Sequence, residues 1–373
     1  MKWLRERIPP AVSSSLVLTA TLLLVLAVVV SALAGCSSDE STPSTSPPPE
    51  PSPSGSEETS ASPSATSTDG APTATDPVSV LGVAAQRHTG DQLRLGAVRQ
   101  RTSDFTSYDV SYRVRSSGPG ARTAPLRITG VLNVPTGEGP FPAVVLAHGY
   151  VDPAVYKSGQ GMTRERGFLA ERGYIALHVD YRGHAGSDPD PSNGTDARLG
   201  YAVDVLGAID ALQGADLPRV PVDDSRVAVF GRSMGGGVVQ KVAEIVPDAA
   251  GAVVAWAAVS SLEAENFNHF IRADNDPRRE RIVQEHGLPE DDPAFWLDAS
   301  ARPYFDRITA PVLSVHGRGD DTCPPRWARA TERAMSEAGV DSDLAWYDDG
   351  HAFGPAFVPA MERTVSFLDD RLG

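Results

Sequence analysis

The chain has 373 residues, of which 41% are hydrophobic and 22% are charged, and its formal net charge is −15. This length allows one large domain with a well-buried core, while the negative charge argues against unassisted binding to nucleic acid, whose phosphates call for a basic surface. The two cysteines, Cys36 and Cys323, give neither a disulfide framework nor a metal-binding motif.

The first 36 residues have the layout of a secretory signal. Residues 2–7 carry three basic side chains, and residues 11–35 form an uncharged run dominated by Leu, Val and Ala. Leu-Ala-Gly-Cys at 33–36 resembles the bacterial lipobox, in which Cys36 would receive a diacylglycerol thioether and become the mature N-terminus. A plain cleaved signal is one alternative, and an uncleaved membrane helix is the other, since the run is long enough to span a bilayer.

All three readings of this segment place the rest of the chain outside the cytoplasm. The lipid or the helix would also tether it to a membrane face. Residues 37–77 are rich in Ser, Thr and Pro and cannot bury a core, so we predict a disordered linker that holds a folded domain, residues 78–373, away from the membrane.

Strand-like segments recur along this domain. Two segments rich in β-branched residues, 108–114 and 126–134, predict an opening antiparallel pair. The later strands are short, nearly continuous apolar runs, which indicates a mostly parallel sheet buried on both faces. These runs occupy 142–147, 174–180, 226–230, 251–257, 311–316 and 344–347.

Helical periodicity fills the intervals between these strands. Apolar residues at helical spacing predict helices over 163–172, 196–212, 235–246, 326–338 and 356–371. Strands that alternate with helices of this size predict an α/β fold with helices on both faces of the sheet. Residues 260–305 break the alternation because they are polar and helix-prone, and we expect them to form a small helical cap inserted over the end of the sheet.

The candidate nucleophile follows the strand at 226–230. Gly231-Arg232-Ser233-Met234-Gly235 is a G-x-S-x-G motif between a strand and a helix, which is the context of the nucleophile elbow in α/β-hydrolases. The turn is so tight that the positions two before and two after Ser233 must be nearly free of side chains.

Serine at neutral pH needs a general base, and the base needs an orienting carboxylate. Their order along an α/β-hydrolase chain is Ser, acid, His. Asp320 and Asp321 follow the strand at 311–316, and His351 follows the last strand, so His351 is the candidate base and the acid is one of the two aspartates. Asp348 and Asp349 are weaker alternatives because they lie too close to His351 in the sequence.

An oxyanion hole requires two donors aimed at the developing negative charge. The backbone N–H of Met234 is the first candidate, and the second should come from the loop at 148–150. Because Gly149 permits a tight turn, we assign the backbone N–H of Tyr150, although a purely structural turn is the alternative.

The chain resembles prolyl oligopeptidase-like and dienelactone hydrolase-like α/β-hydrolases in the segment 231–237 and in the acid motif at 310–324. In those families the first Asp after the His-Gly turn is catalytic, so the resemblance selects Asp320. It implies an α/β-hydrolase fold over about residues 125–373, a Ser-His-Asp triad and no metal or organic cofactor. Only residues 78–140 precede the hydrolase motifs, far too few for the β-propeller of the prolyl oligopeptidases proper.

The sequence therefore predicts a serine hydrolase that acts on a small-molecule ester or a peptide. A carboxylesterase is the preferred interpretation, and a peptidase without a propeller is the alternative. A non-catalytic surface binding protein would be a third possibility, because one fold hosts many functions. Four aromatic residues of the cap are candidates for lining an acyl pocket, although core packing explains them equally well: Phe267, Phe270, Phe295 and Trp296.

Overall fold

The computed structural model describes residues 76–122, 124–274 and 276–373. The predicted signal segment with Cys36 and the predicted linker up to residue 75 lie outside the described residues. Across these three ranges, no helix combines the length and the apolar character that crossing a bilayer requires.

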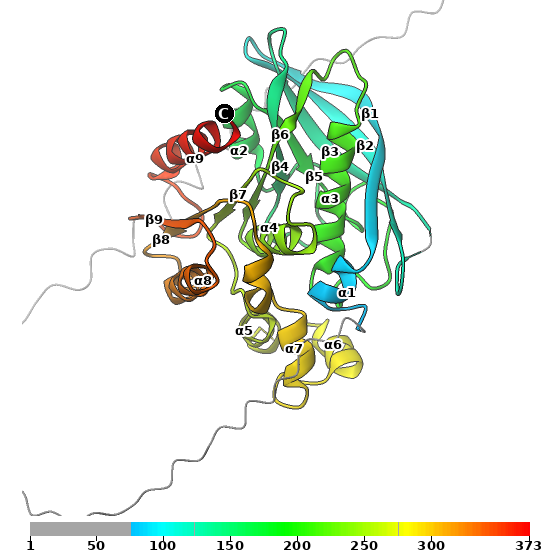
Figure 1. The fold of residues 1–373 in the computed structure, drawn as a ribbon, viewed down its shortest axis with the longest axis vertical. Helices are drawn as coiled ribbons and strands as arrows, with labels where there is room; N and C mark the ends of the chain where they lie inside the picture. The colour runs from blue at the N-terminus through cyan, green and yellow to red at the C-terminus, as the bar shows by residue number, and fades with distance from the viewer. Residues whose placement is uncertain (1–75, 123, 275) are drawn as a thin grey trace, which may run out of the picture. The chain divides into compact units, whose positions relative to one another are not determined.

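A nine-stranded sheet forms the centre of the domain, in the order β1-β2-β3-β5-β4-β6-β7-β8-β9 (Figure 1). β1, β2, β3 and β5 pair antiparallel, whereas β5, β4 and β6 to β9 pair in parallel. The predicted mostly parallel sheet, opened by an antiparallel pair, is confirmed. The strands are β1 (Arg87–Arg101), β2 (Phe105–Ser117), β3 (Leu126–Pro135), β4 (Phe141–Ala147), β5 (Ile175–Val179), β6 (Val222–Arg232), β7 (Ala252–Trp256), β8 (Val312–Gly317) and β9 (Ser342–Tyr347).

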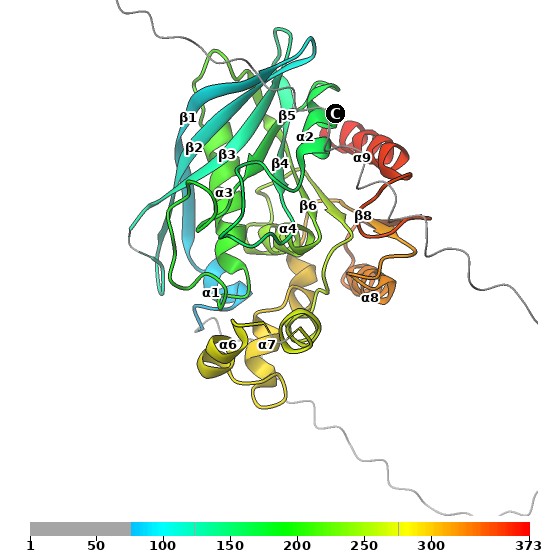
Figure 2. The same cartoon turned by 180° about the vertical axis from the view of Figure 1, so that it is seen from behind.

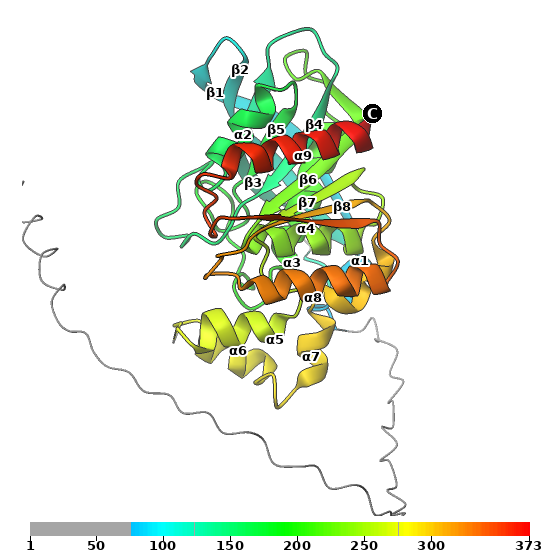
Figure 3. The same ribbon diagram turned by 90° about the vertical axis from the view of Figure 1, so that its left-hand side faces the viewer.

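Helices cover both faces of this sheet, as predicted. Figure 3 shows α9 and α8 on opposite sides of β8. Neighbouring residues of one strand enter different cores, since Val144 packs in the layer of α2 and α9 while Val145 packs in the layer of α3 and α4. This two-sided burial explains the continuous apolar runs in the sequence. The helices of the two layers are α2 (Thr163–Ala170), α3 (Leu199–Gln213), α4 (Met234–Ile245), α8 (Pro325–Glu337) and α9 (Phe357–Leu372).

The structure adds two elements that the sequence analysis did not predict, the short helix α1 (Val80–Ala84) and the long strand β1. β1 is an edge strand whose side chains are mostly exposed. Its register with β2 shifts three times, and Gln92 takes a positive φ of 56° at the first shift. Exposure and bulges remove the alternation of apolar and polar residues that identifies a strand.

The predicted cap consists of short helices that gather beside α4 and α8 (Figures 1 and 3). Phe267, Ile282 and the adjacent pair Phe295 and Trp296 form a small apolar cluster among them. Because the cluster is small and the helices are short, contacts with the main domain are needed to hold the cap. Its elements are α5 (Glu263–Asn266), the π-helix η1 (Phe267–Arg272), α6 (Arg279–His286) and α7 (Pro293–Asp298), followed by the 3₁₀ helix η2 (Arg302–Arg307).

Candidate active site

Ser233 lies in the turn between β6 and α4 with φ 57° and ψ −120°, a strained conformation for a residue with a side chain. The flanking glycines make this turn possible. A Cβ on Gly231 would lie 2.0 Å from the carbonyl oxygen of Gly235, and a Cβ on Gly235 would lie 1.9 Å from that of Ala147. Either side chain would force the backbone apart, so the two glycines of the motif are a steric requirement.

Asp320 and His351 come together at the ends of β8 and β9. Nδ1 of His351 lies 2.9 Å from Oδ2 of Asp320 and 3.1 Å from Oδ1. Asp320 is 4% exposed, and its Oδ1 also accepts the backbone N–H groups of Thr322 at 3.0 Å and Cys323 at 2.7 Å. These bonds fix the carboxylate in the orientation that an imidazole partner requires.

The other candidate acids have different contacts. Asp321 is exposed and accepts a weak hydrogen bond from the hydroxyl of Thr322 at 3.3 Å. The side chain of Asp348 is 93% exposed and pairs with Arg318. Asp349 accepts the backbone N–H groups of Gly350 and Ala356 at 2.8 Å each, so it shapes the loop that carries His351. Asp320 is thus the aspartate among the four that contacts the imidazole.

Ser233 and His351 line the same pocket. Across the described part of the chain, no hydrogen bond joins the hydroxyl of Ser233 to the imidazole. Because Asp320 occupies the Nδ1 side of His351, Nε2 is the ring nitrogen that remains available to a nucleophile. Catalytic hydrogen bonds are often long before substrate binds, so this geometry is compatible with a triad.

Both candidate oxyanion donors are placed beside Ser233. Met234 is the first residue of α4, where backbone N–H groups have no partner within the helix and the helix dipole is positive. Tyr150 follows β4 and lines the same pocket as Ser233 and Met234. A Cβ on Gly149 would lie 3.1 Å from Cβ of Ser233, so glycine at this position lets the loop approach the nucleophile.

Two other histidines near this end of the sheet, His148 and His316, make structural contacts. His148 is fully buried, stacks on Tyr156 at 4.7 Å and on His178 at 5.3 Å, and its Nδ1 lies 2.6 Å from the carbonyl oxygen of Gly149. Burial lowers the pKa of His148 to about 3, so this ring is neutral. His316 lies 3.4 Å from Oδ2 of Asp320 and bonds the carbonyl of Cys323, a support for the acid loop that its position in the sequence did not reveal.

Cys323 packs with Val259 and Trp327 and is fully buried. Burial raises the pKa of its thiol to about 12, while a hydrogen bond with Ser233 acts in the opposite direction. The thiol is therefore protonated at neutral pH and behaves as a small buried apolar group.

Two arginines hold the backbone of the loop that carries the base, and the sequence analysis did not identify them. Arg232, adjacent to Ser233, donates to the carbonyl of His351 at 2.9 Å. Arg164 donates to the next two carbonyls, those of Ala352 at 2.9 Å and Phe353 at 3.1 Å. We call Arg232, Arg164 and their shared partner Glu165 the histidine-loop clamp.

Glu165 is the anchor of this clamp. It is 1% exposed and pairs with Arg232 at 3.2 Å and with Arg164 at 3.8 Å. The nucleophile turn and the base loop are therefore tied to the same buried carboxylate on α2. Arg232 stands visibly inside the G-x-S-x-G motif, but nothing in the local spacing could reveal partners more than 60 residues away.

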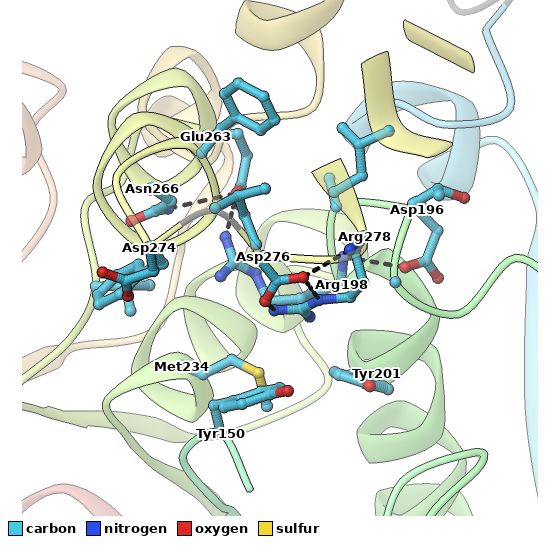
Figure 4. A pocket seen from close by; sticks show the side chains of 18 of the residues that line it. Tyr150, Asp196, Arg198, Tyr201, Met234, Glu263, Asn266, Asp274, Asp276 and Arg278 are labelled. Carbon is cyan, nitrogen blue, oxygen red and sulfur yellow. Dashed lines mark hydrogen bonds and ion pairs between the residues drawn. The ribbon is translucent and has the colours of Figure 1, made fainter. Parts of the chain in front are cut away.

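Ser233 lines a pocket of about 590 Å³. Figure 4 shows other residues that line this pocket. Tyr150, Met234 and Tyr201 lie on one side of it, and Asn266 and Asp274 of the cap lie on the other. The four aromatic residues proposed for an acyl pocket all line it, and three of them also belong to the apolar cluster of the cap. These residues therefore line the pocket, and their role in binding an acyl group stays a prediction.

Charged residues attach the cap to the main domain at this pocket. Glu263 pairs with Arg198 and, at 2.7 Å, with the buried Lys241 of α4. Burial alone would raise the pKa of Glu263, but the two cations hold it below its ordinary value, so Glu263 is ionised. Arg278 forms two bonds to Asp276, at 2.9 and 2.8 Å, and its guanidinium lies 4.9 Å from the centre of the Tyr150 ring.

Comparisons with known proteins identify the family of the chain. The model of the prolyl oligopeptidase family matches residues 161–373. A dipeptidyl aminopeptidase BIII from Pseudoxanthomonas mexicana is 28% identical over 229 residues, which is 58% of this chain and 31% of that protein. The chain spans about a third of the length of the curated relatives that it matches first.

Solved structures show the fold. An acetyl xylan esterase from Paenibacillus sp. R4 has a TM-score of 0.57 at 20% identity and covers 77% of this chain and 92% of its own. Dipeptidyl peptidase 4 of Porphyromonas gingivalis has a TM-score of 0.51 at 16% identity, over 76% of this chain and 36% of that one. The predicted α/β-hydrolase fold is confirmed.

Proposed function

The chain belongs to the prolyl oligopeptidase family and is a serine hydrolase, and from this premise we propose that it hydrolyses carboxylic esters through an acyl-enzyme on Ser233. The substrate is a small molecule whose acyl group enters the pocket between the main domain and the cap. The observation that carries this proposal is that the pocket joins the serine to an aromatic wall supplied by the cap.

The residues divide the chemistry as follows. Oγ of Ser233 attacks the ester carbonyl while Nε2 of His351 accepts the hydroxyl proton, and Asp320 stabilises the resulting imidazolium. The N–H groups of Met234 and Tyr150 stabilise the tetrahedral oxyanion. When the intermediate collapses, the imidazolium returns its proton to the leaving alcohol. Water then attacks the carbonyl of the acyl-enzyme while His351 accepts its proton, and the collapse of the second tetrahedral intermediate releases the acid and restores Ser233.

The pocket favours acyl groups of limited size. Its volume of about 590 Å³ falls within the roughly 300–1,000 Å³ typical of small-molecule sites. Phe267, Phe295 and Trp296 offer an apolar surface, whereas a peptide running through the site would need backbone hydrogen-bond partners along its length. The acetyl xylan esterase that shares this fold acts, by its name, on an ester, and the structural match covers 92% of that protein.

Cleavage of peptides from their amino end is the second candidate. The dipeptidyl aminopeptidase relative points to it, and so does Asp274, which lines the pocket and forms no ion pair within the described part of the chain. A carboxylate there would attract the ammonium group of a peptide's first residue.

Turnover of matched chromogenic substrates separates the two candidates. We expect the full chain to cleave p-nitrophenyl acetate and butyrate with a kcat/KM at least roughly 100-fold above that for alanyl-p-nitroanilide and dipeptidyl p-nitroanilides. This ratio corresponds to a difference of about 2.7 kcal/mol in transition-state stabilisation. A preference for the anilides would replace the esterase proposal with the peptidase one. The Asp274→Asn variant should then lose anilide activity selectively.

We also propose that the protein is lipid-anchored at Cys36 and acts outside the cytoplasm. Its support is the signal layout and the Leu-Ala-Gly-Cys segment at 33–36. Mass analysis of the mature protein from a bacterial membrane fraction should find a diacylglycerol thioether on Cys36. An unmodified N-terminus beyond residue 36, or an intact signal segment, would contradict it.

A further inference from the structure

Strands β1 to β3 form a basic region in an acidic protein. Residues 87–135 contain eight arginines and three aspartates, a formal net charge of +5, whereas the whole chain carries −15. We call these three strands the basic ribbon. Such local concentration of one sign in a chain of the opposite sign creates a field that attracts anions.

Three of these arginines surround a groove of about 210 Å³, the space of about seven water molecules at roughly 30 Å³ each. Arg113 stands directly opposite Arg127 in the β2–β3 pair, and Arg94 stands opposite Ser111 in the β1–β2 pair. We call this the arginine groove. Its complete lining is Gln92, Arg94, Ser111, Tyr112, Arg113 and Arg127.

The groove lies on the face of the ribbon that α3 does not cover. Tyr112 reaches α3 and donates to the carbonyl of Asp204 at 2.8 Å, so its neighbours Ser111 and Arg113 point to the other face. Figure 2 views β1, β2 and β3 from this side, with α3 behind them. A ligand can therefore reach the groove from solvent.

Among the described residues, no carboxylate forms an ion pair with Arg94, Arg113 or Arg127. The ion pairs of this part of the structure use Arg99, Arg115 and Arg122. Two aspartates lie close to the groove. Asp91 stands opposite Arg113 in the β1–β2 pair, but its carboxylate pairs with Arg115. Asp188 accepts the backbone N–H of Arg127 at 2.8 Å. Within the described residues, the guanidinium groups of Arg94, Arg113 and Arg127 thus have no acidic partner. Arg113 and Arg127 face each other across β2 and β3, and like charges directly opposite each other lower the stability of a sheet.

The backbone also prepares the groove. Arg127 donates to the carbonyl of Gly186 at 2.7 Å, which orients its guanidinium. The register shift between Asp91 and Arg94, with Gln92 at φ 56°, sets where Arg94 emerges from the edge strand. Bulges of this kind commonly redirect a side chain near a functional site.

We propose that the arginine groove binds a phosphate group. Planar guanidinium groups match phosphate oxygens in paired, charge-assisted hydrogen bonds, and three of them line this groove without an ion-pair partner among the described residues. The phosphate comes either from solution or from the headgroup of an anionic phospholipid. The second source would be close at hand if Cys36 carries the predicted lipid. The site is separate from the pocket over Ser233 and does not depend on the proposed reaction.

Isothermal titration of the full chain in neutral detergent micelles tests this proposal. The two probes are sodium phosphate and monomeric dihexanoyl phosphatidylglycerol, with sodium chloride and dihexanoyl phosphatidylcholine as references. The test variant is R113Q/R127Q. The matched control, R87Q/R101Q, removes the same charge from the same ribbon outside the groove.

We expect saturable binding of at least one probe. Affinity should fall roughly tenfold for each groove arginine removed, hence about 100-fold in R113Q/R127Q, and stay within about twofold in the control. Binding of both probes makes free phosphate sufficient, and binding of the phosphatidylglycerol alone identifies a lipid headgroup as the ligand. Binding of neither probe, or an equal loss in the control, would overturn the proposal.

Stability gives an independent measurement. Because Arg113 and Arg127 repel each other, R113Q/R127Q should have a Tm equal to or above that of the wild type. A clear loss of Tm would show that the double substitution also disturbs the sheet, and an unchanged affinity in Arg94→Gln would then overturn the proposal. The Arg94→Gln variant, at an exposed position, then serves as the second test of binding and should lose roughly tenfold.

Discussion

The loops that carry the triad and the cap that covers it are built in different ways. Ser233, Asp320 and His351 each follow a strand of the parallel sheet, and backbone hydrogen bonds and steric limits hold them. The cap consists of short helices with a small aromatic cluster, joined to the main domain by ion pairs. This difference suggests that the triad loops determine the rate of the reaction and the cap determines which substrate reacts.

The largest expected effect tests the triad. Asp320→Asn should lower kcat by about 10⁴-fold, because the amide favours the wrong imidazole tautomer and cannot stabilise the imidazolium. Asp321→Asn is the matched control and should change kcat less than twofold, since Asp321 is exposed. Steady-state kinetics on p-nitrophenyl acetate measures both, and equal losses in the two variants would refute the assignment of Asp320.

The histidine-loop clamp provides the next test. Arg232→Gln frees the carbonyl of His351 and leaves Glu165 with a weaker partner. We expect kcat to fall roughly 10- to 100-fold with KM nearly unchanged, because small displacements of a catalytic group have costs of this size. Arg232→Lys should recover part of the loss by keeping the ion pair with Glu165.

The control for the clamp is Arg318→Gln, which removes an exposed arginine paired with the exposed Asp348. Arg318→Gln should leave both kcat and KM unchanged. If Arg232→Gln instead raised KM at constant kcat, Arg232 would act in binding substrate and the clamp would have no role in placing the base.

The cap should affect specificity. Phe270 lines the pocket, so Phe270→Ala should lower kcat/KM for p-nitrophenyl hexanoate roughly tenfold and leave the acetate ester almost unaffected, because only the longer acyl chain reaches that wall. Leu297→Ala is the control, since Leu297 is 50% exposed on the cap. Equal losses for both esters would show that the cap also positions the triad.

The smallest effect concerns the attachment of the cap in acid. The cations of Arg198 and Lys241 hold the pKa of Glu263 low, so its stabilising contribution is complete above the ordinary glutamate pKa of about 4.3 and is lost as the pH falls through the lower folded value. The difference in unfolding free energy between wild type and Glu263→Gln should therefore shrink below about pH 4. Chemical denaturation of both proteins at a series of pH values from 7 to 3 measures this difference in unfolding free energy.

The exposed Glu285, which pairs with Arg281 on the same cap, supplies the control. Glu285→Gln should show a small difference at every pH. A difference for Glu263→Gln that stays constant down to pH 3 would mean that ionisation of Glu263 does not hold the cap.

The sequence was informative where one local pattern determines one structure. Val144 and Val145 lie in continuous apolar runs that only a doubly covered strand explains, and the glycines around Ser233 leave one possible turn. β1 was missed because its exposure and bulges erase the periodicity. The choice between Asp320 and Asp321 depends on the N–H groups of Thr322 and Cys323, which spacing does not reveal.

Long-range contacts were beyond the sequence. Glu165, Arg232 and His351 are separated by 67 and 119 residues, and only the folded sheet brings them together. The same holds for Arg94, Arg113 and Arg127, whose convergence depends on the register of three strands. In the sequence, each of these arginines taken alone indicates only a solvent-exposed surface position.

Covalent labelling with a fluorophosphonate probe tests the central claim most directly, because the probe reacts only with a serine that its neighbours activate. The full wild-type chain should gain one phosphonyl group on Ser233 within minutes, while Ser233→Ala should remain unlabelled and His351→Ala should label at least roughly 10³-fold more slowly. A wild-type protein that resists the probe, or a Ser233→Ala variant that still reacts, would contradict a hydrolase built on Ser233, Asp320 and His351.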